Sequence, residues 1–468
     1  MNFKLRPYQE ECVQKGLEVL TDGKGRKEVI IAATSSGKSL IIGEIAKRLP
    51  EGKVLVLSPN VEILEQNLSK INSFGVFPSV YSASANKKET EEKLIYGTPK
   101  SITYEVFKEL GIKYVIVDEC DFSSKPDSEM VTLLKKLKVN SVLGLTGSAI
   151  YMENTIDGSV PRIMTQVKNA FFTDICKVVD INFMVANGLW SDIQYYDVFD
   201  ASKQEILKLN KSGSEFLEES QKSFYEACDL KNKIADFLSR LPEEEDALVF
   251  VSDIFSAEEL QKEIPNSVLV HSKMNKKLRK EYVEGFKNNK HRVMINVGTL
   301  LVGFDKDTMV NIVDASASNS IRIYIQKIGR IVRKHKDKKL GRIIDFAGNY
   351  QRHGHVHDLN YDYIDGYGWG LYRGDVLITD VPLNSGKVFT KEYLRNGGKV
   401  KLEYTFGEHN KGDCKLPFGA YKGKSVKELY YRKRHYLKYL YDSGFTHEDK
   451  ELERQIKNIW NIPCTSQN

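Results

Sequence analysis

The chain has 468 residues, of which 41% are hydrophobic and 28% charged, and it has no Pro- or Gly-rich tract long enough to form a disordered tail. At about 150 residues per domain, this length predicts roughly three folding units and excludes a small single-core module. The longest apolar runs, such as 29–33 and 54–57, have the length of strands, so we expect no membrane-spanning helix and no signal peptide.

Cysteine content and net charge exclude few classes of protein. The six cysteines are scattered and form no Cys-x-x-Cys pair, so we expect no structural zinc, no disulfide framework and a reducing, cytoplasmic setting. A net charge of +6 is weak evidence for a polyanionic partner. The distribution says more, because basic residues gather at 330–342 and 422–438, the second stretch being interleaved with tyrosines.

Short apolar runs, each followed by a turn and a helical pattern, recur along the chain. In the first part they predict buried parallel strands at 28–32, 53–57, 113–117 and 141–145. In the second part the same pattern predicts strands at 247–251, 268–270, 292–297, 310–313 and 342–346. The expected fold class is therefore α/β, with two doubly wound parallel-sheet lobes.

The stretches outside these strands suggest where the domains end. Residues 201–241 have helical spacing and no strand-like run, which predicts a helical connection between the lobes. After residue 347 the pattern breaks into mixed short segments and a helical C-terminus. We therefore expect lobe 1 at 1–195, the connection at 196–241, lobe 2 at 242–352 and a small mixed C-terminal region at 353–468.

A polar cluster directly follows the predicted strand 28–32, where open α/β sheets bind their ligands. It consists of Thr34, Ser35, Ser36, Gly37, Lys38 and Ser39. A tight loop that leads into a helix presents backbone N–H groups to phosphates, so we name residues 32–39 the phosphate loop. Lys38 is expected to neutralise phosphate and the Ser39 hydroxyl to ligate Mg²⁺. Ala32 and Ser35 stand where this loop type usually has glycine.

Two acidic residues, Asp118 and Glu119, end the predicted strand 113–117. Asp118 would hold magnesium through water, and Glu119 would position and deprotonate an attacking water. An isolated Asp-Glu pair after a strand is usually a solvated turn. About eighty residues after a phosphate loop, the pair instead indicates nucleotide hydrolysis.

The most specific cluster is the arginine segment, residues 326–333, which contains Gln326, Gly329, Arg330 and Arg333. Arg330 and Arg333 are three residues apart, so we expect them to share one face of a helix. From there two guanidinium groups could reach a γ-phosphate bound on the opposite lobe. The alternative is a basic helix face that pairs with Asp or Glu.

Together these clusters resemble superfamily 2 helicases over most of residues 5–354, in the order typical of that family. The resemblance implies that ATP and Mg²⁺ are bound, with Arg6 and Gln9 near adenine and Gly303 and Asp305 near the nucleotide. It also implies that Thr146, Gly147 and Ser148 couple the ATP site to the nucleic-acid site, so residues 146–149 are called the coupling segment. The implied contacts to a nucleic-acid strand are Pro59, Asn60, Gln66, Thr98, Thr103, Ser252, His271 and Thr299.

The sequence departs from the DEAD-box RNA helicases, and these departures favour a resemblance to DNA-translocating motors. DEAD-box RNA helicases carry His-Arg and Ser-Ala-Thr where this chain has Gln326-Lys327 and Thr146-Gly147-Ser148. Residues 345–349 with His353-Gly354 resemble restriction-subunit motors and branch-migrating motors of the UvsW and RecG class, including helicases of tailed T-odd phages. The implied substrates are single-stranded and branched DNA (forks, Holliday junctions, D-loops), with the host cytoplasm as the setting if the chain is phage-encoded. An RNA helicase and a non-unwinding subunit of a restriction-type complex remain alternatives.

Two further features lie in the expected C-terminal region. His353, His355 and His357 alternate, but no Cys or acidic cluster completes a site, so we expect no metal there. Residues 417–425 and 436–440 resemble a small module appended to nucleases and phage proteins, in which Lys422 and Lys424 would contact phosphate. Its tyrosines could stack on bases or simply form a core. The oligomeric state is left open, with a monomer favoured.

Overall fold

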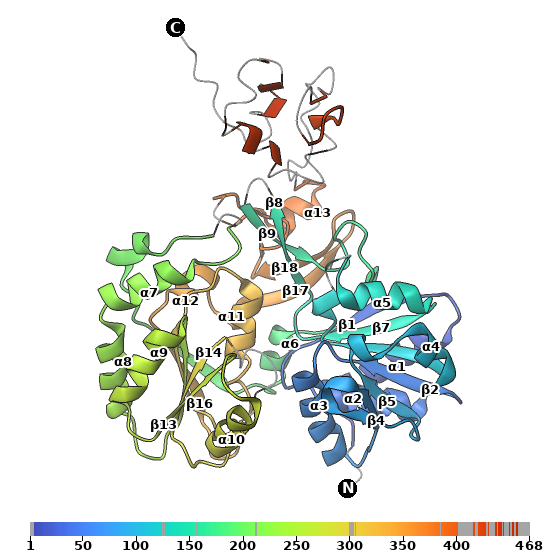
Figure 1. Ribbon diagram of the computed structural model, residues 1–468, viewed down its shortest axis with the longest axis horizontal. Helices are drawn as coiled ribbons and strands as arrows, with labels where there is room; N and C mark the ends of the chain where they lie inside the picture. Colours follow the sequence, from blue (N-terminus) through green and yellow to red (C-terminus); the bar gives the residue numbers. More distant parts are fainter. Residues whose placement is uncertain are drawn as a thin grey trace.

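The computed structural model describes residues 4–123, 125, 127–155, 158–210, 213–298, 304, 306–383 and 385–400, with scattered residues between 415 and 456. Three of the expected site residues, Thr299, Gly303 and Asp305, lie outside the described residues. Two lobes stand side by side, and a small antiparallel sheet lies above the junction between them (Figure 1). The expected fold class is confirmed.

Lobe 1 is built on an eight-stranded sheet of order β10-β1-β7-β6-β2-β5-β3-β4, parallel except for the last pair. The strands are β1 Lys27–Ala32, β2 Lys53–Leu57, β3 Ser79–Ser82, β4 Lys87–Lys88, β5 Leu94–Gly97, β6 Ile112–Asp118, β7 Val142–Thr146 and β10 Asp174–Val179. The helices are α1 Pro7–Thr21, α2 Lys38–Arg48, α3 Val61–Ser73, α4 Tyr104–Glu109, α5 Glu129–Leu137 and α6 Ile181–Ala186, with short 3₁₀ turns at Ala83–Ala85, Pro99–Ser101 and Cys120–Ser123.

Lobe 2 repeats the scheme on a six-stranded, all-parallel sheet of order β11-β16-β15-β12-β14-β13. Its strands are β11 Asp192–Asp197, β12 Ala247–Val251, β13 Ser267–His271, β14 Val293–Val297, β15 Asn311–Ala315 and β16 Leu340–Asp345. Its helices are α7 Glu218–Ala227, α8 Leu230–Ser239, α9 Ile254–Glu263, α10 Lys276–Lys287, α11 Ile321–Ile328 and α12 Asn349–His353, with a 3₁₀ segment at Ala201–Ile206.

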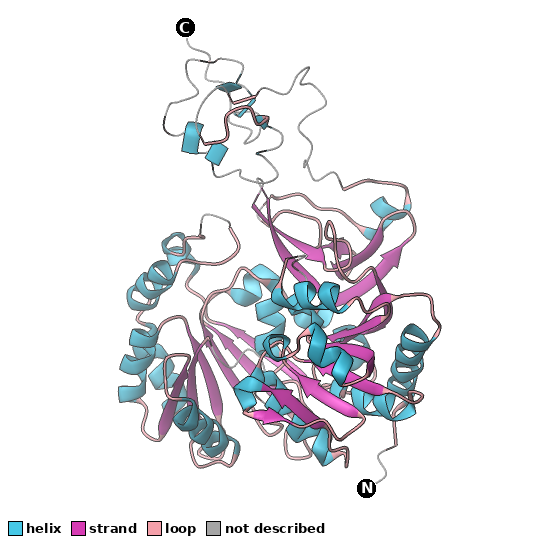
Figure 2. Cartoon of the chain, turned by 45° about the vertical axis from the view of Figure 1, so that its right-hand side comes forward, coloured by secondary structure: helices cyan, strands magenta, loops and turns pink. Residues whose placement is uncertain are grey.

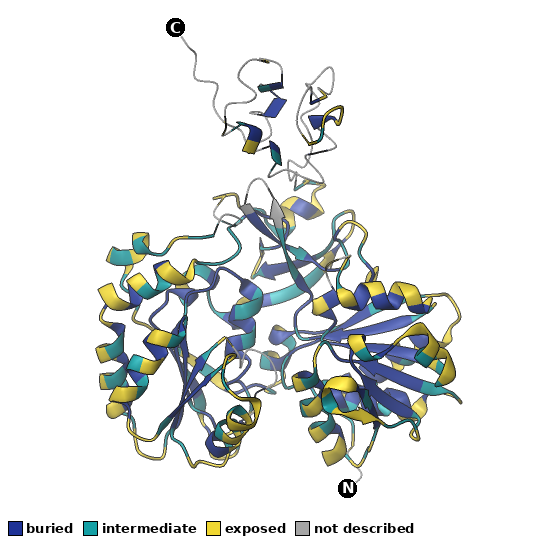
Figure 3. Cartoon of the chain, viewed as in Figure 1, coloured by how far each residue is buried: buried dark blue, intermediate teal, exposed yellow. Residues whose placement is uncertain are grey.

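The central strands of both sheets are buried because their side chains are apolar on both faces. Helices cover both faces, so the strands are buried while the outer helix faces are exposed (Figure 3). All nine expected strands are confirmed, with ends that differ by at most two residues. The strands that sequence reasoning missed include β10 and β11, which lie at sheet edges and carry polar residues such as Lys177 and Gln194.

The expected boundary between lobe 1 and the connection, at residue 195, needs correction because it cuts through β11. That strand pairs with β16 along its whole length, from Asp192 beside Leu340 to Asp197 beside Asp345. The expected helical connection does contain α7 and α8, but a β-bridge joins Leu209 to Phe216 ahead of them. Since Phe224 and Ile234 are buried in the core of the second sheet, this stretch packs as part of lobe 2.

A third structural unit, here called the accessory sheet, consists of β17 Leu359–Ile364, β18 Gly368–Arg373 and β19 Val376–Leu377. The turn Val356–Asp358 precedes it and α13 Lys391–Arg395 follows. It packs beside a hairpin from lobe 1, β8 Ile150–Thr155 and β9 Gly158–Ile163 (Figure 2). Backbone N–H groups of Asp380 and Leu383 donate to Pro161 O and Ser159 O, at 2.8 and 3.0 Å. The accessory sheet is therefore docked on lobe 1.

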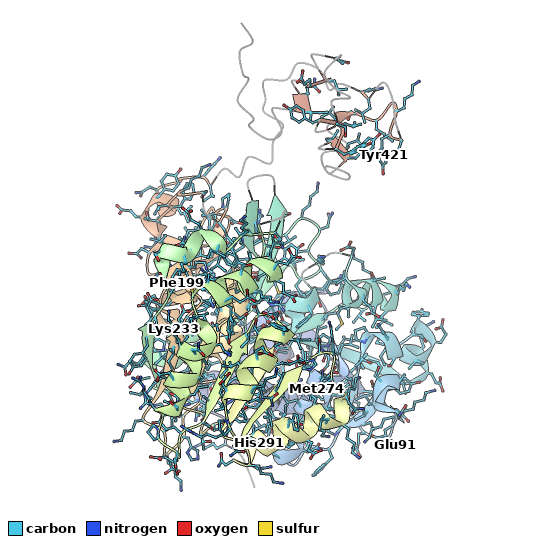
Figure 4. All side chains as sticks on the ribbon, turned by 60° about the vertical axis from the view of Figure 1, so that its left-hand side comes forward. Glu91, Phe199, Lys233, Met274, His291 and Tyr421 are labelled. Carbon is cyan, nitrogen blue, oxygen red and sulfur yellow. The ribbon has the colours of Figure 1, made fainter. Side chains whose placement is uncertain are left out.

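The last described residues form a separate small core of Leu416, Val426, Leu429, Leu437, Leu440, Leu452 and Ile456. Tyr421, Tyr436 and Tyr441 pack against it, whereas Tyr439 is 55% exposed. Figure 4 shows Tyr421 well apart from Met274 and His291 of lobe 2. Several of the C-terminal tyrosines are thus core residues. No helix in the described part of the chain is long and apolar enough to cross a membrane.

Candidate nucleotide site between the lobes

A cleft of about 510 Å³ lies between the two lobes and collects most of the residues expected to bind nucleotide. Lobe 1 contributes the phosphate loop, the end of β6 and one side of α3, and lobe 2 contributes the arginine segment. The lining residues include Arg6, Thr34, Ser35, Gly37, Lys38, Ser39, Gln66, Asn67, Lys70, Glu119, Gly147, Ser148, Asp307, Gln326, Arg330, Arg333 and Lys334.

The phosphate loop has the backbone of an anion-binding turn. Ser35 and Gly37 have φ values of 68° and 89°, so two left-handed residues turn the chain into α2. A Cβ added at Gly37 would lie 2.5 Å from Gln9 Nε2, so the glycine is also required for space. The Oγ atoms of Ser35 and Ser36 are buried without a hydrogen-bond partner among the described residues. A buried loop with unsatisfied polar atoms fits a phosphate ligand.

Lys38 and Glu119 form an ion pair, with Nζ 2.9 Å from Oε1. Burial alone would lower the pKa of Lys38, but the charges of Glu119 and Asp118 raise it above its usual value. Burial alone would raise the pKa of Glu119, but Lys38 holds it below the usual value. Glu119, expected to activate water, is therefore ionised and paired with the lysine expected to bind phosphate.

Asp118 has the properties of a cation ligand. Burial, followed by the charge of Glu119, raises its pKa to about 7. Its Oδ1 atom is buried and has no hydrogen-bond partner among the described residues. A divalent cation would stabilise the ionised form of this carboxylate, so Asp118 and the Ser39 hydroxyl fit Mg²⁺. No group of three or more His, Cys, Asp or Glu side chains in the described residues is arranged to hold a metal by itself.

Asn67, which sequence reasoning missed, fixes the other oxygen of Asp118. Its Nδ2 donates to Asp118 Oδ2 from the second turn of α3. The helix is started by Asn60, whose side chain accepts from Ile63 N at 2.9 Å. Gln66, expected to contact the nucleic-acid strand, lines the cleft beside Asn67. In the sequence, only its position next to Gln66 could have indicated a role for Asn67. The contact with Asp118 depends on the fold, which brings α3 beside β6.

Gln9 uses both ends of its amide within the protein. Its Oε1 accepts from Arg6 N and its Nε2 donates to Ser36 O, both at 2.9 Å. The Tyr8 hydroxyl donates to the same Ser36 carbonyl at 3.0 Å. In this structure Gln9 therefore supports the phosphate loop. Reading of adenine by Gln9 stays a prediction, and the amide keeps a second N–H and a second acceptor position for it.

The expectation that Arg330 and Arg333 share a helix face is wrong. Helix α11 ends at Ile328 and Gly329 is its C-cap, so Arg330 lies in the following turn. The backbone of Arg333 forms a β-bridge with Trp190. Both arginines still line the cleft opposite the phosphate loop. Arg330 Nη1 donates to Phe304 O at 2.6 Å, which orients its guanidinium group within lobe 2.

The arginine segment packs against Thr34 of the phosphate loop. A Cβ added at Gly329 would lie 2.8 Å from Thr34 Oγ1, so the glycine permits close contact between the lobes. Trp190 Nε1 donates to Thr34 O at 2.9 Å. Ser191, the next residue, donates from its N to Val332 O and from its Oγ to Arg333 O, both at 2.8 Å. Neither Trp190 nor Ser191 was predicted.

The coupling segment lies where the lobes meet. The Thr146 hydroxyl donates to Asp121 Oδ1 at 3.1 Å and accepts from Ser148 N at 3.1 Å. The other carboxylate oxygen of Asp121 lies 2.9 Å from Arg322 Nε on α11 of lobe 2. An ion pair thus joins the coupling segment to the helix that leads into the arginine segment. Sequence reasoning missed both members of this pair.

The remaining expected strand contacts have local structural roles. Asn60 and Thr103 cap α3 and α4, and Thr98 is buried with its hydroxyl 3.2 Å from Ser82 Oγ. Pro59, Ser252 and His271 follow or end parallel strands, and Lys422 and Lys424 are exposed beside the C-terminal core. Nucleic-acid contact by these residues stays a prediction.

The histidines at 353–357 are used in packing. His353 Nε2 lies 2.9 Å from Ser318 O, and the rings of His355 and His357 are 4.4 Å apart.

Two parallel-sheet lobes that meet at a cleft lined by the phosphate loop and the arginine segment form a RecA-like, two-lobed architecture. Residues 2–150 match the family model described as "Type III restriction enzyme, res subunit". Residues 230–335 match the model described as "Helicase conserved C-terminal domain". The two matched parts together make up more than half of the chain, and both are superfamily 2 helicase domains, so the chain contains the two domains of a superfamily 2 helicase.

Its relatives are distant. It is 26% identical over 378 residues to a protein named helicase 22 in Sulfolobus islandicus filamentous virus, covering 75% of this chain. It is 23% identical over 373 residues to ATP-dependent DNA helicase uvsW of Enterobacteria phage T4, covering 74% of this chain and 70% of that protein. The chain spans only 65% of the length of the first relative.

Two solved structures share the fold. The type ISP restriction-modification enzyme LlaBIII bound to DNA has a TM-score of 0.52 at 17% identity, covering 74% of this chain and 28% of that one. A fragment assigned as the HsdR subunit of a type I restriction enzyme from Vibrio vulnificus has a TM-score of 0.54 at 17% identity, covering 75% and 65%. At this identity the likeness concerns the fold alone.

Proposed function

We propose that this protein is an ATP-driven DNA translocase that unwinds or remodels branched DNA. One observation carries the proposal: Lys38 and Glu119 of lobe 1 and Arg330 and Arg333 of lobe 2 line a single cleft. Hydrolysis then requires both lobes, so any change in how the lobes meet changes the rate. Arginines placed in this way typically contribute about 10³- to 10⁵-fold in rate.

The residues divide the chemistry among them. The phosphate loop and Lys38 would hold the phosphates, and Asp118 with Ser39 would hold Mg²⁺, which neutralises phosphate charge when bound. Lys38 must exchange its 2.9 Å contact with Glu119 for phosphate. That exchange releases an ionised Glu119, which can then orient a water and take its proton.

Strand-contacting segments on both lobes would convert the lobe motion into translocation. The predicted contacts Asn60 and Thr103 belong to lobe 1, whereas Ser252 and His271 belong to lobe 2. Closing and opening the cleft would change the distance between the strand contacts of lobe 1 and those of lobe 2. Contacts to the phosphate backbone of the nucleic acid give salt-sensitive binding with little base preference.

Support for DNA comes from the distant relatives and from the restriction-type family model over residues 2–150. The proposal that the substrate is branched DNA rests on the likeness to the phage protein and on the exposed lysines of the C-terminal core. The same family model favours one alternative, a non-unwinding translocating subunit of a restriction-type complex. RNA unwinding is the other alternative.

Substitution within the cleft tests the ATPase. Glu119→Gln should abolish DNA-stimulated ATP hydrolysis while equilibrium binding of ATP and DNA is kept, and Lys38→Ala should lose ATP binding as well. Lys47→Ala, which removes a 72% exposed lysine of α2, is the matched control. Turnover at the wild-type rate in Glu119→Gln would contradict the assignment.

The substrate is tested by comparing ATPase stimulation by RNA, single-stranded DNA and four-way junctions. We expect the strongest stimulation by the junctions, and a preference for RNA would overturn the DNA assignment. A strand-displacement assay on the purified chain separates unwinding from translocation alone.

A further inference from the structure

The accessory sheet contacts the coupling segment directly through Tyr361, near the start of β17. The Tyr361 hydroxyl accepts a hydrogen bond from Ala149 N at 3.1 Å. Its backbone N donates to Asp180 Oδ2 at 3.0 Å, while the other oxygen of Asp180 caps α6 by accepting from Phe183 N at 2.9 Å. A residue 212 positions away from Ala149 is thus held in place at both its backbone and its hydroxyl.

The coupling segment faces the nucleotide site on its other side. A Cβ added at Gly147 would lie only 3.3 Å from Lys38 Nζ, so no side chain separates the segment from the lysine of the phosphate loop. Thr146 donates to Asp121, which pairs with Arg322 of lobe 2. Four consecutive residues therefore contact the cleft and the accessory sheet, and they are linked to lobe 2 through Asp121.

Tyr361 is suited to hold this contact. Its ring packs against a hydrophobic core within lobe 1 and against a second core that extends through both lobes and the accessory sheet. Burial raises the pKa of its hydroxyl, which stays neutral. Ala149 is fully buried, so its N–H depends on the Tyr361 hydroxyl as its hydrogen-bond acceptor. Movement of β17 would therefore oblige the coupling segment to move with it.

The accessory sheet is also braced on either side of Tyr361. Arg162 of β9 lies 2.7 Å from Asp380 Oδ1, just beyond β19. Trp369 Nε1 donates to Asp174 Oδ1 at 3.2 Å, at the start of β10. These contacts join the sheet to lobe 1 on both sides of Tyr361.

We propose that Tyr361 is a positioning residue through which the accessory sheet sets the coupling segment, so that binding events in the C-terminal region act on ATP hydrolysis. The inference rests on the proposed function, because the coupled event is nucleic-acid-stimulated hydrolysis. Tyr361 is not among the residues that line the nucleotide cleft, and it contacts the coupling segment at Ala149 N.

Tyr361→Phe removes only the hydroxyl and keeps the packed ring. We expect the unstimulated ATPase rate and the KM for ATP to stay within about twofold of wild type, while stimulation by four-way-junction DNA falls about five- to tenfold, as for one lost hydrogen bond. The matched control is Tyr363→Phe, the same change two residues along β17 on a side chain that is 54% exposed.

Amide hydrogen exchange of the full chain, without nucleic acid, supplies a second readout. The peptide that contains Ala149 should exchange faster in Tyr361→Phe and at the wild-type rate in Tyr363→Phe. Equal loss of basal and stimulated turnover, or unchanged stimulation and exchange, would overturn the inference. If the wild type itself shows no stimulation by any nucleic acid, the proposed function fails, and the exchange data still decide whether Tyr361 positions Ala149.

Discussion

The Nε atom of Arg322 in lobe 2 lies 2.9 Å from Oδ2 of Asp121 in lobe 1. Only 1% of the Asp121 side chain is exposed, compared with 27% for Arg322, whose guanidinium group lies over the Phe122 ring at 4.9 Å. Burial raises the pKa of Asp121 to about 6, and the Arg322 charge keeps it from rising further. The pair is thus a link between the lobes that depends on a buried charge.

Arg322→Gln should weaken this link and leave Asp121 buried without its arginine. Breaking a fully buried pair costs about 3 to 5 kcal/mol, and the partial exposure of Arg322 reduces the expected loss to about 2 kcal/mol of unfolding free energy. We expect DNA-stimulated ATPase to fall more than ATP binding. Urea unfolding and ATPase titrations check this against Arg240→Gln, a 76% exposed arginine of lobe 2. Equal unfolding free energies and equal ATPase rates of the two variants would show that the Asp121–Arg322 pair contributes to neither.

The pH dependence of stability should reveal the buried carboxylates. Burial raises the pKa of Asp118 to about 7 and that of Asp121 to about 6, above the usual 3.8. A carboxyl with a raised folded-state pKa stabilises the fold below its unfolded pKa and loses that contribution as pH rises through its folded pKa. Unfolding free energy without nucleotide should therefore decrease between about pH 4 and 7. Asp118→Asn should flatten this slope in urea titrations, whereas Asp236→Asn, at an exposed site, should not.

Removal of Asn67 should act on the metal requirement. Its amide donates to Asp118 and lowers the pKa of that carboxyl, so Asn67→Ala should raise this pKa further. The pH midpoint for Mg²⁺-dependent ATP binding should move upward, and about tenfold more Mg²⁺ should be needed near neutral pH. Calorimetric binding at several Mg²⁺ concentrations measures the shift. Asn72→Ala, at an exposed position of the same helix, should bind as wild type does.

A methyl group at Gly329 should push the lobes apart. The added Cβ of Gly329→Ala would meet Thr34 Oγ1 at 2.8 Å, too close for the cleft to close fully. We expect kcat for ATP to fall at least about tenfold with ATP binding retained, because lobe 1 still holds the phosphates. Steady-state kinetics with Gly43→Ala as control would check this, since that methyl meets only side chains of lobe 1, Ile71 at 3.3 Å and Val76 at 3.8 Å. A normal kcat would contradict a requirement for close contact at Thr34.

Truncation can separate the C-terminal core from the accessory sheet. A cut at residue 354 would also remove Tyr361, so the informative deletion begins at residue 401, beyond α13. We expect this variant to keep DNA-stimulated ATPase on single strands and to lose preference for four-way junctions. Equal losses on both substrates would indicate that the C-terminal core is only structural.

The sequence by itself determined the parts whose signals are local. Continuous Val, Ile and Leu runs predicted the buried strands, because a strand covered on both faces needs apolar residues throughout. Lys38, Asp118 and Glu119 were found because strand ends place them on one edge of a sheet, whatever the rest of the chain does.

The tertiary structure decided how these parts meet. Arg330 and Arg333 were recognised from spacing, but a helix face was the wrong geometry because α11 ends at Ile328. Beyond it, Gly329 packs on Thr34 and Arg333 forms a β-bridge with Trp190. Arg322 and Tyr361 have no local signal, and Asn67 has only its position next to Gln66. Their roles arise from contacts with Asp118, Asp121 and Ala149, residues 51 to 212 positions away in sequence, and only the packing of separate units brings such residues together.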